Sequence, residues 1–302
     1  MTRQLISILL LATLFSFAPP AQLAESGSVP VRLIISPDNR SASSIASALR
    51  EALDARGIAS SVHALDQFNS LDTGERGLLV SIGNASSQRL QETHPQSSRL
   101  SLGTRRSGDA PSYAHLNIAQ PFCRQLALIT ALSDDIRRVS MIASTTDRFA
   151  ADEPRMRRCA KRLGLELKLV IKREQESVNS VLRRALDTDA LLALPDPAIY
   201  NRSNIRNVLL LSYRKRIPVI GFSEAFVSAG ALAALYSTPE LIAIQAASII
   251  EGGLQAGRFD STLYQPDSYE MKINRFVSKS LGIEIPSDAQ LRSSIDEELR
   301  DE

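Results

Sequence analysis

Short apolar runs alternate with segments of helical periodicity along most of the chain. The stretches Val31–Ser36 and Leu78–Ile82 have the length and character of buried strands. Between them, Ile45, Leu49 and Leu53 return at the spacing of one helix face. Further runs of strand length occupy residues 139–143, 165–171, 190–194 and 218–222. Strands that alternate with helices in this way predict an α/β fold of parallel sheets with helices on both faces.

Three stretches depart from this alternation. Residues 95–113 are rich in Ser, Arg, Gly and Pro and show little periodicity, which predicts a loop. The stretch Tyr264–Lys272 predicts one late strand. The last residues, 289–302, are acidic and predict a frayed tail, because chain ends are often poorly ordered.

Polar residues follow several of the apolar runs, where the carboxyl ends of strands are expected. Open α/β sheets bind ligands at those ends. Ser36 and Asp38 follow one run, Gly83–Ser86 a second and Ser144 a third. The segment Gly83–Ser86 leads into a predicted helix, whose free N–H groups suit a carboxylate or phosphate. A plain turn with a capping serine is the alternative at this position.

Asp196 lies between Pro195 and Pro197, directly after a predicted strand. Proline restricts its own φ and the conformation of the residue before it, so Asp196 is expected to be held rigidly. Its carboxylate is then suited to pair with a ligand ammonium group. Asp is also a frequent helix cap, and this alternative stays open.

Ser223 and Glu224 follow another predicted strand. The segment Gly221–Ala225 is similar to a hydrolase nucleophile elbow but lacks the second glycine, and every histidine precedes it. A hydrolase that uses Ser223 is therefore a minor alternative, and we expect no enzyme activity. No motif for a cofactor occurs, and the histidines are too scattered for a metal site. These histidines are His63, His94 and His115.

The amino terminus has the pattern of a secretory signal. Arg3 precedes the apolar stretch Leu5–Phe17, and prolines and small residues follow. We predict a signal peptide over residues 1–26 and a soluble, exported mature protein. The net charge of +2 does not indicate nucleic-acid binding. The aromatic content of 5%, without Trp, weighs against a sugar receptor.

Cys123 and Cys159 are the two cysteines of the chain. Their spacing is not that of a redox motif. Two buried, unpaired residues are the favoured interpretation, since free Cys is often buried. A disulfide is the alternative in an oxidising compartment.

Five further segments have a recognisable pattern: Asp189–Pro197, Arg216–Glu224, Ala229–Leu235, Gln120–Ile129 and Ile273–Pro286. They resemble the ABC transporter substrate-binding family of type I periplasmic proteins. The resemblance covers Val31 to Pro286 and is strongest from residue 115 onward. It implies two doubly wound parallel-sheet lobes joined by a hinge. The implied division is 29–119 plus 237–262 for lobe I, 120–236 plus 263–288 for lobe II, and 289–302 for the tail.

The same resemblance implies that the lobes close over a small ligand; some members bind aromatic amino acids or related molecules. Carried over by position, the ligand-facing residues are Gly83, Ala85, Ser86, Ser144, Asp196, Ser223 and Glu224. The expected role is the solute-binding component of an ABC uptake system, a monomer whose partner is a membrane permease. A periplasmic sensor or scaffold for a membrane receptor is the alternative. It is suggested by Leu100–Gly108, which replaces the family's usual proline-containing segment.

Overall fold

The computed structural model describes residues 31–36, 39–68, 77–95, 97–104, 113–146 and 153–300. The predicted signal peptide and Asp38 lie outside these ranges. Within them, no helix combines the length and apolar character needed to cross a bilayer. The same ranges contain no group of three or more His, Cys, Asp or Glu side chains suited to a metal ion.

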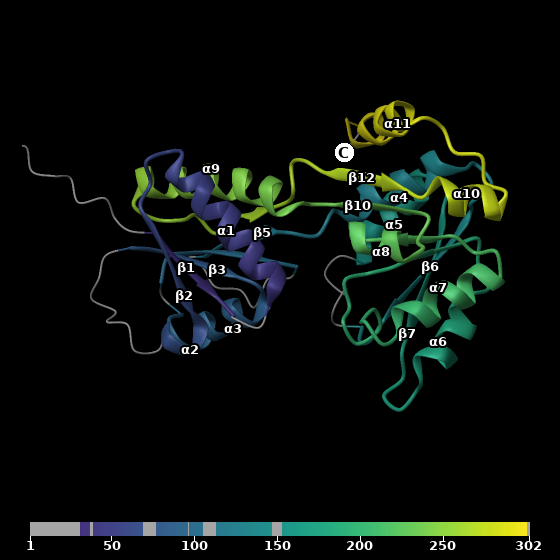
Figure 1. Cartoon of the computed structure of the whole chain (residues 1–302), viewed down its shortest axis with the longest axis horizontal. Helices are drawn as coiled ribbons and strands as arrows, with labels where there is room; N and C mark the ends of the chain where they lie inside the picture. The colour runs from purple at the N-terminus through teal and green to yellow at the C-terminus, as the bar shows by residue number, and fades with distance from the viewer. Residues whose placement is uncertain are drawn as a thin grey trace, which may run out of the picture.

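The first lobe is built on a six-stranded parallel sheet of order β11-β5-β4-β3-β1-β2 (Figure 1). Its strands are β1 (Val31–Ile35), β2 (Ser60–Ala64), β3 (Leu78–Ile82), β4 (Arg99–Gly103), β5 (Tyr113–Asn117) and β11 (Leu263–Tyr264). Helices α1 (Arg40–Asp54) and α9 (Pro239–Ala256) cover one face, and α2 (Leu65–Phe68) and α3 (Asn84–Thr93) lie on the other. The larger apolar core lies under α1 and α9.

Local sequence explains why the two long helices of this lobe form. Asn39 caps α1 by accepting a hydrogen bond from the Ala42 N–H, at 3.1 Å. Thr238 caps α9, which has a proline at its first position. The helix ends at Gly257, whose φ of 71° suits glycine. The predicted apolar face of α1, with Ile45, Leu49 and Leu53, is buried in the core under both helices.

The second lobe is built on another six-stranded sheet, of order β12-β10-β9-β8-β6-β7. Its strands are β6 (Arg138–Ala143), β7 (Glu166–Ile171), β8 (Ala190–Leu192), β9 (Val219–Gly221), β10 (Ala233–Tyr236) and β12 (Glu270–Ile273). All are parallel except β12, which pairs antiparallel with β10. The chain crosses between the lobes three times in its described part. We call residues 118–121, 237–238 and 265–269 the first, second and third crossing.

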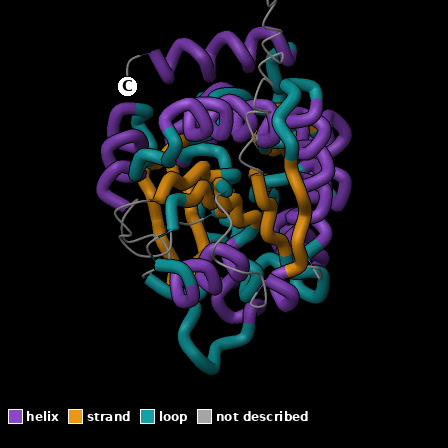
Figure 2. The backbone as a smooth tube through the Cα atoms, turned by 90° about the vertical axis from the view of Figure 1, so that its left-hand side faces the viewer, coloured by secondary structure: helices purple, strands orange, loops and turns teal. Residues whose placement is uncertain are grey.

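Helices cover both faces of this second sheet as well. One face packs against α4 (Phe122–Leu132), α5 (Glu153–Arg162) and α11 (Asp288–Arg300). The other packs against α6 (Val178–Ala185), α7 (Ile205–Arg214) and α8 (Glu224–Ala229). The short helix α10 (Arg275–Leu281) follows β12. Figure 2, a view from the first lobe, shows the strands enclosed by helices. The predicted fold, two doubly wound lobes, is confirmed.

The prediction of a loop over residues 95–113 is wrong. Strand β4 and the start of β5 occupy part of this stretch, and β4 is buried between β3 and β5. Its alternate side chains are polar, which hid the strand in the sequence. Arg99 donates to the His94 carbonyl at 3.0 Å and also to Gln91 Oε1, and Ser101 bonds to Ser87. Helix α3 thus supplies partners for the polar side chains of the strand.

Two further predictions near the carboxyl terminus differ from the structure. The stretch Tyr264–Lys272 is not one strand, because β11 lies in the first sheet and β12 in the second. The return to the second lobe is therefore a few residues later than expected. The predicted frayed tail is instead helix α11, in which Leu291 and Ile295 are fully buried. They pack in the core that contains α4, and this burial holds the helix in place.

Cys123 and Cys159 form a disulfide, so the favoured interpretation of two unpaired cysteines is wrong. The bond joins the start of α4 to α5, with the Cα atoms 5.5 Å apart. Helix packing brings the two residues to this distance, and their sequence separation of 36 gave no indication of it.

Candidate functional site

The order of strands identifies one position in each sheet where a ligand site is expected. In the first sheet the direction of winding reverses between β1 and β3, and in the second between β6 and β8. The connections on either side of such a switch point leave opposite faces of the sheet, which opens a crevice at the carboxyl ends of the strands. Ser36 and Gly83 follow β1 and β3, whereas Ser144 and Asp196 follow β6 and β8.

In the first lobe, the switch point leads into the amino terminus of α3. Gly83 precedes this helix with a φ of 97°, which favours glycine, and it offers no capping side chain. Ala85 is exposed, whereas Ser86 is fully buried and its Oγ has no hydrogen-bond partner. An unpartnered hydroxyl beside a helix start is suited to an anionic group.

The start of α3 is braced against the end of β4 by Asn84, which lies within the candidate segment Gly83–Ser86, and by Thr104, which the sequence did not indicate. Asn84 Nδ2 donates to Thr104 Oγ1 at 3.0 Å, and the Thr104 N–H donates back to Asn84 Oδ1 at 3.2 Å. Gly103 leaves room for this brace, because a Cβ there would lie 2.5 Å from Asn84 Oδ1. In the sequence, the only indication of this close contact is the glycine at the end of the strand.

In the second lobe, Asp196 joins the two strand ends of the switch point. The Ser144 N–H donates to its Oδ2 at 2.7 Å, and the Ala198 N–H donates to its Oδ1 at 3.0 Å. The residue is only 1% exposed. Burial and the nearby Asp196 carboxylate raise the pKa of Tyr200 well above its usual value. The carboxylate thus binds backbone N–H groups at a strand end and in the turn after Pro195, whereas the next helix, α7, begins only at Ile205, so these contacts are not those of the predicted helix cap.

The crossings between the lobes are tied together by Gln120, which is 7% exposed. Its Nε2 donates to Ser237 Oγ on the second crossing at 2.7 Å and to the Ser268 carbonyl on the third at 3.0 Å. Its Oε1 accepts from Arg124 at 2.6 Å. Arg124 also donates to the Pro266 carbonyl at 3.0 Å. One glutamine therefore links all three crossings.

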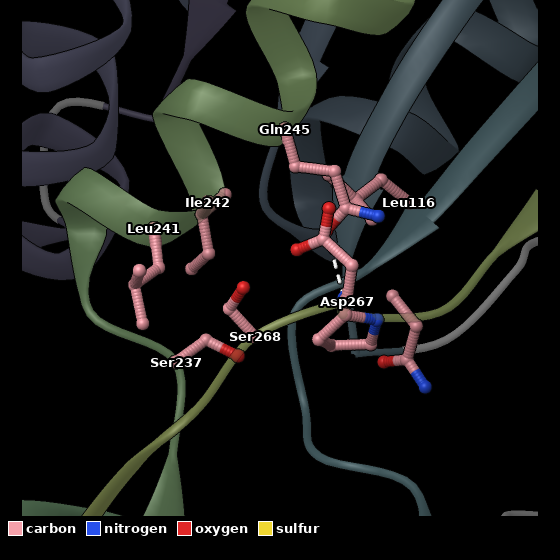
Figure 3. Close-up of a pocket in the computed structure, with 9 residues that line it drawn as sticks. Leu116, Ser237, Leu241, Ile242, Gln245, Asp267 and Ser268 are labelled. Carbon is pink, nitrogen blue, oxygen red and sulfur yellow. Dashed lines mark hydrogen bonds between the residues drawn. The ribbon is translucent and has the colours of Figure 1, made fainter. Parts of the chain in front are cut away.

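The third crossing is also held from the first lobe. Asn117 Nδ2 donates to Gln265 Oε1 at 3.2 Å, and Gln245 Nε2 donates to the Gln265 carbonyl at 2.8 Å. A small pocket lies beside the start of α9 and is lined in part by the third crossing (Figure 3). At this pocket the Asp267 N–H donates to Gln245 Oε1 at 3.3 Å. Hydrogen bonds from both lobes therefore hold the crossings in place. This arrangement is that of a hinge.

Comparison with protein families agrees with this architecture. The family described as ABC transporter substrate binding protein matches residues 110–294, more than half of the chain. The chain belongs to this family. A comparison with curated proteins finds no match.

Solved structures of binding proteins share the fold at low sequence identity. CD0873, a substrate binding protein with adhesive properties from Clostridium difficile solved in a ligand-free, open form, superposes with a TM-score of 0.67 and 15% identity, covering 87% of this chain and 97% of that chain. An ABC domain in complex with L-Trp from Streptococcus pneumoniae superposes with a TM-score of 0.64 and 15% identity. The match covers 87% of this chain and 98% of that chain. A conserved domain protein from Vibrio cholerae superposes with a TM-score of 0.65 and 18% identity. The match covers 88% of this chain and 98% of that chain.

In this substrate-binding protein, Ser223 and Glu224 lie at the carboxyl end of β9. Ser223 precedes α8, and its side chain makes no capping hydrogen bond. Glu224 forms an ion pair with Lys272 on β12 and raises the pKa of that lysine. The three histidines lie on or beside β2, α3 and β5 in the first lobe, whereas Ser223 belongs to the second. No histidine is therefore placed in the same lobe to activate Ser223 as a nucleophile.

Proposed function

We propose that this chain is the periplasmic solute-binding component of an ABC-type uptake system. It would bind a small ligand between its lobes and present it to a membrane permease. The single observation that carries the proposal is that the carboxyl ends of both sheets, the ends at which the switch points lie, adjoin one hinge. Strands β5 and β10 run from their carboxyl ends directly into the first and second crossings. The carboxyl ends of both sheets therefore adjoin the same hinge, where a ligand can touch both lobes.

The mechanism follows from the hinge. The separated lobes share few contacts, so a ligand that binds both stabilises the closed form by its extra contacts there. In the first lobe, we assign Ser36, Gly83, Ala85 and Ser86 to the ligand surface, with an anionic group at the start of α3. In the second lobe, Ser144 and Ser223 complete it.

Export is the second part of the proposal. The signal pattern over residues 1–26 supports it. The disulfide supports it independently, because such bonds persist in oxidising compartments such as the periplasm.

The alternative role is a sensor or scaffold for a membrane receptor. Its reason is the unusual segment Leu100–Gly108, of which Leu100–Gly103 forms part of the buried strand β4. Residues 105–108 lie outside the described ranges.

The test is a thermal-shift screen of the mature chain, residues 27–302, against amino acids, organic acids and small anions. A ligand at about 100 times its Kd should stabilise the protein by about 2.7 kcal/mol. A folded protein that responds to no compound in a broad panel would refute the proposal.

Two neighbouring serines then separate binding from folding. Ser86→Ala removes a buried hydroxyl without a partner, so the ligand-free protein should keep or gain stability while ligand affinity falls. Ser87→Ala is the matched control: it breaks bonds to Ser81 and Ser101, so stability should fall and affinity should hold. Equal affinity in the wild type and Ser86→Ala would exclude this serine from the site.

A further inference from the structure

Positive charge is concentrated on one unit of the second lobe. Helix α5, the edge strand β7 and helix α6 follow one another over residues 153–185, which contain ten Lys and Arg but four Asp and Glu. Helix α1, the edge strand β2 and helix α2 occupy the equivalent place in the first lobe, where residues 40–68 contain three residues of each sign. The excess of positive charge is therefore not a requirement of the fold.

Several of these positive charges have no acidic partner. Two of the four acids are already used in ion pairs inside the unit, between Arg157 and Glu153 and between Arg184 and Glu176, each at 2.6 Å. Four further cations take part in no ion pair between described residues, and we call them the basic edge: Lys161, Lys168, Lys172 and Arg173. The lysines of this set that form hydrogen bonds donate to backbone carbonyl oxygens, which carry no net charge.

Helix α11 has an acidic end, but this end lies away from the basic edge. Arg162 of α5 donates to the Glu298 carbonyl on α11 at 2.9 Å, and the disulfide joins Cys159 of α5 to α4. Both residues mark the flank of α5 that faces α4 and α11. At about 3.6 residues per turn, Lys161 lies on the other flank, towards the edge of the sheet.

The basic edge is on the side of the lobe remote from the hinge. Strands β10 and β12 are joined by the second and third crossings, and β7 is at the opposite end of the strand order. Figure 1 shows β7 and α6 on the side of the second lobe away from the crossings. Lobes that are joined on one side open on the other, so the cleft opens on the side of the basic edge.

The chemistry of this surface indicates what kind of partner it fits. A lysine on an edge strand can simply block pairing with another strand, but that role needs no cations on the adjoining helix and loop. Protein partners are usually held by aromatic or apolar anchors, and residues 153–185 expose no large hydrophobic side chain. Exposed charge without such anchors fits a broad anionic surface, such as phospholipid headgroups.

We propose that the basic edge rests on the anionic headgroups of the membrane that holds the permease. The choice of a bilayer as the anionic surface rests on the proposed function. The attachment is peripheral and reversible, because no apolar side chain accompanies the charges into the bilayer. The cleft opens on the same side, so the attached protein presents the mouth of its cleft to the membrane.

The first test is co-sedimentation of the mature chain, residues 27–302, with vesicles of equal parts phosphatidylglycerol and phosphatidylcholine. The wild type should bind these vesicles at least about ten-fold more tightly than vesicles of phosphatidylcholine alone. Raising the salt from about 0.05 to 0.5 M should release the protein, because salt screens the charges. Equal binding to both kinds of vesicle, or binding to neither, would overturn the proposal.

The second test locates the surface with two triple variants that remove the same charge. Each basic residue near an anionic bilayer contributes about five-fold to binding, so replacing Lys161, Lys168 and Arg173 by Gln should weaken vesicle binding at least ten-fold. The matched control replaces three exposed arginines of the first lobe by Gln and should change binding less than about three-fold; they are Arg40, Arg50 and Arg89. Equal losses in both variants would mean that overall charge is responsible and would overturn the assignment.

Melting curves show whether both variants fold. If the first does not, the single variant Lys161→Gln replaces it, with an expected loss of about five-fold. If the wild type is retained by a polyglutamate column but does not bind the vesicles, the partner is an acidic polypeptide and the membrane assignment fails. The thermal-shift screen judges solute binding separately, so a protein that binds a solute but no vesicle refutes this proposal alone.

Discussion

Breaking the disulfide between Cys123 and Cys159 should destabilise the second lobe by a predictable amount. The bond closes a loop with a sequence separation of 36 and ties α4, the first helix after the first crossing, to α5. The chain-entropy relation for a crosslink of that length gives about 3.8 kcal/mol at 25 °C, because the bond restricts the unfolded chain. For a folding unit of about 150 residues, this corresponds to a melting temperature lower by roughly 8–15 °C.

The measurement is urea unfolding of one protein with and without dithiothreitol, followed by circular dichroism and by tyrosine fluorescence, since the chain has no Trp. Both cysteines are buried, at 1% and 5% exposure, so samples need long incubation for the reductant to act through unfolded molecules. The Cys123→Ala, Cys159→Ala double variant is the control, and dithiothreitol should not change its unfolding curve. A loss below about 1 kcal/mol on reduction would refute the reasoning, because it would mean that the bond constrains the unfolded chain far less than its loop length requires.

Four further outcomes are expected. Gly252→Ala should stabilise α9 by about 0.5–1 kcal/mol, since its added Cβ meets open space. Gly253→Ala should instead cost about 1–3 kcal/mol in the same urea assay, because its Cβ would lie 2.5 Å from a phenylalanine ring; equal effects would contradict this. Leu291→Ala should cost about 2–5 kcal/mol, as expected for a fully buried anchor of α11, and a neutral result would mean that the helix is not docked. Hydrogen bonding to Arg184 lowers the pKa of Glu176 to about 2, so the stability difference between wild type and Glu176→Gln should persist above pH 4.5 and vanish as the pH falls towards 2; a difference that does not depend on pH would contradict the pairing.

Much of the architecture could be predicted from local patterns. Helix and strand periodicities are properties of short segments, so α1, α9 and most central strands could be recognised without knowledge of their neighbours. The segments that begin at Ser36, Gly83 and Ser144 were recognised for the same reason, since each follows an apolar run. Their grouping at two switch points depends on strand order, which only the tertiary structure provides.

The errors have a common physical cause. Strand β4 carries Arg99 and Ser101, whose polarity is acceptable only because α3 supplies partners for them. Helix α11 has two fully buried side chains among residues 288–298, Leu291 and Ile295, and it is ordered because the core containing α4 covers both. In each case the stabilising group lies elsewhere in the chain, where a local pattern contains no information about it.

The sequence by itself determined the fold class, the chain's resemblance to a family of binding proteins and the places where polar groups end strands. These follow from periodicity and residue type, which act over a few positions. Tertiary structure decided which distant groups meet: Cys123 with Cys159, Gln120 with the three crossings, and Asp196 with the Ser144 N–H, 52 positions away. Hydrogen bonds and disulfides act over a few ångströms, and only packing of the whole chain brings such partners within that range.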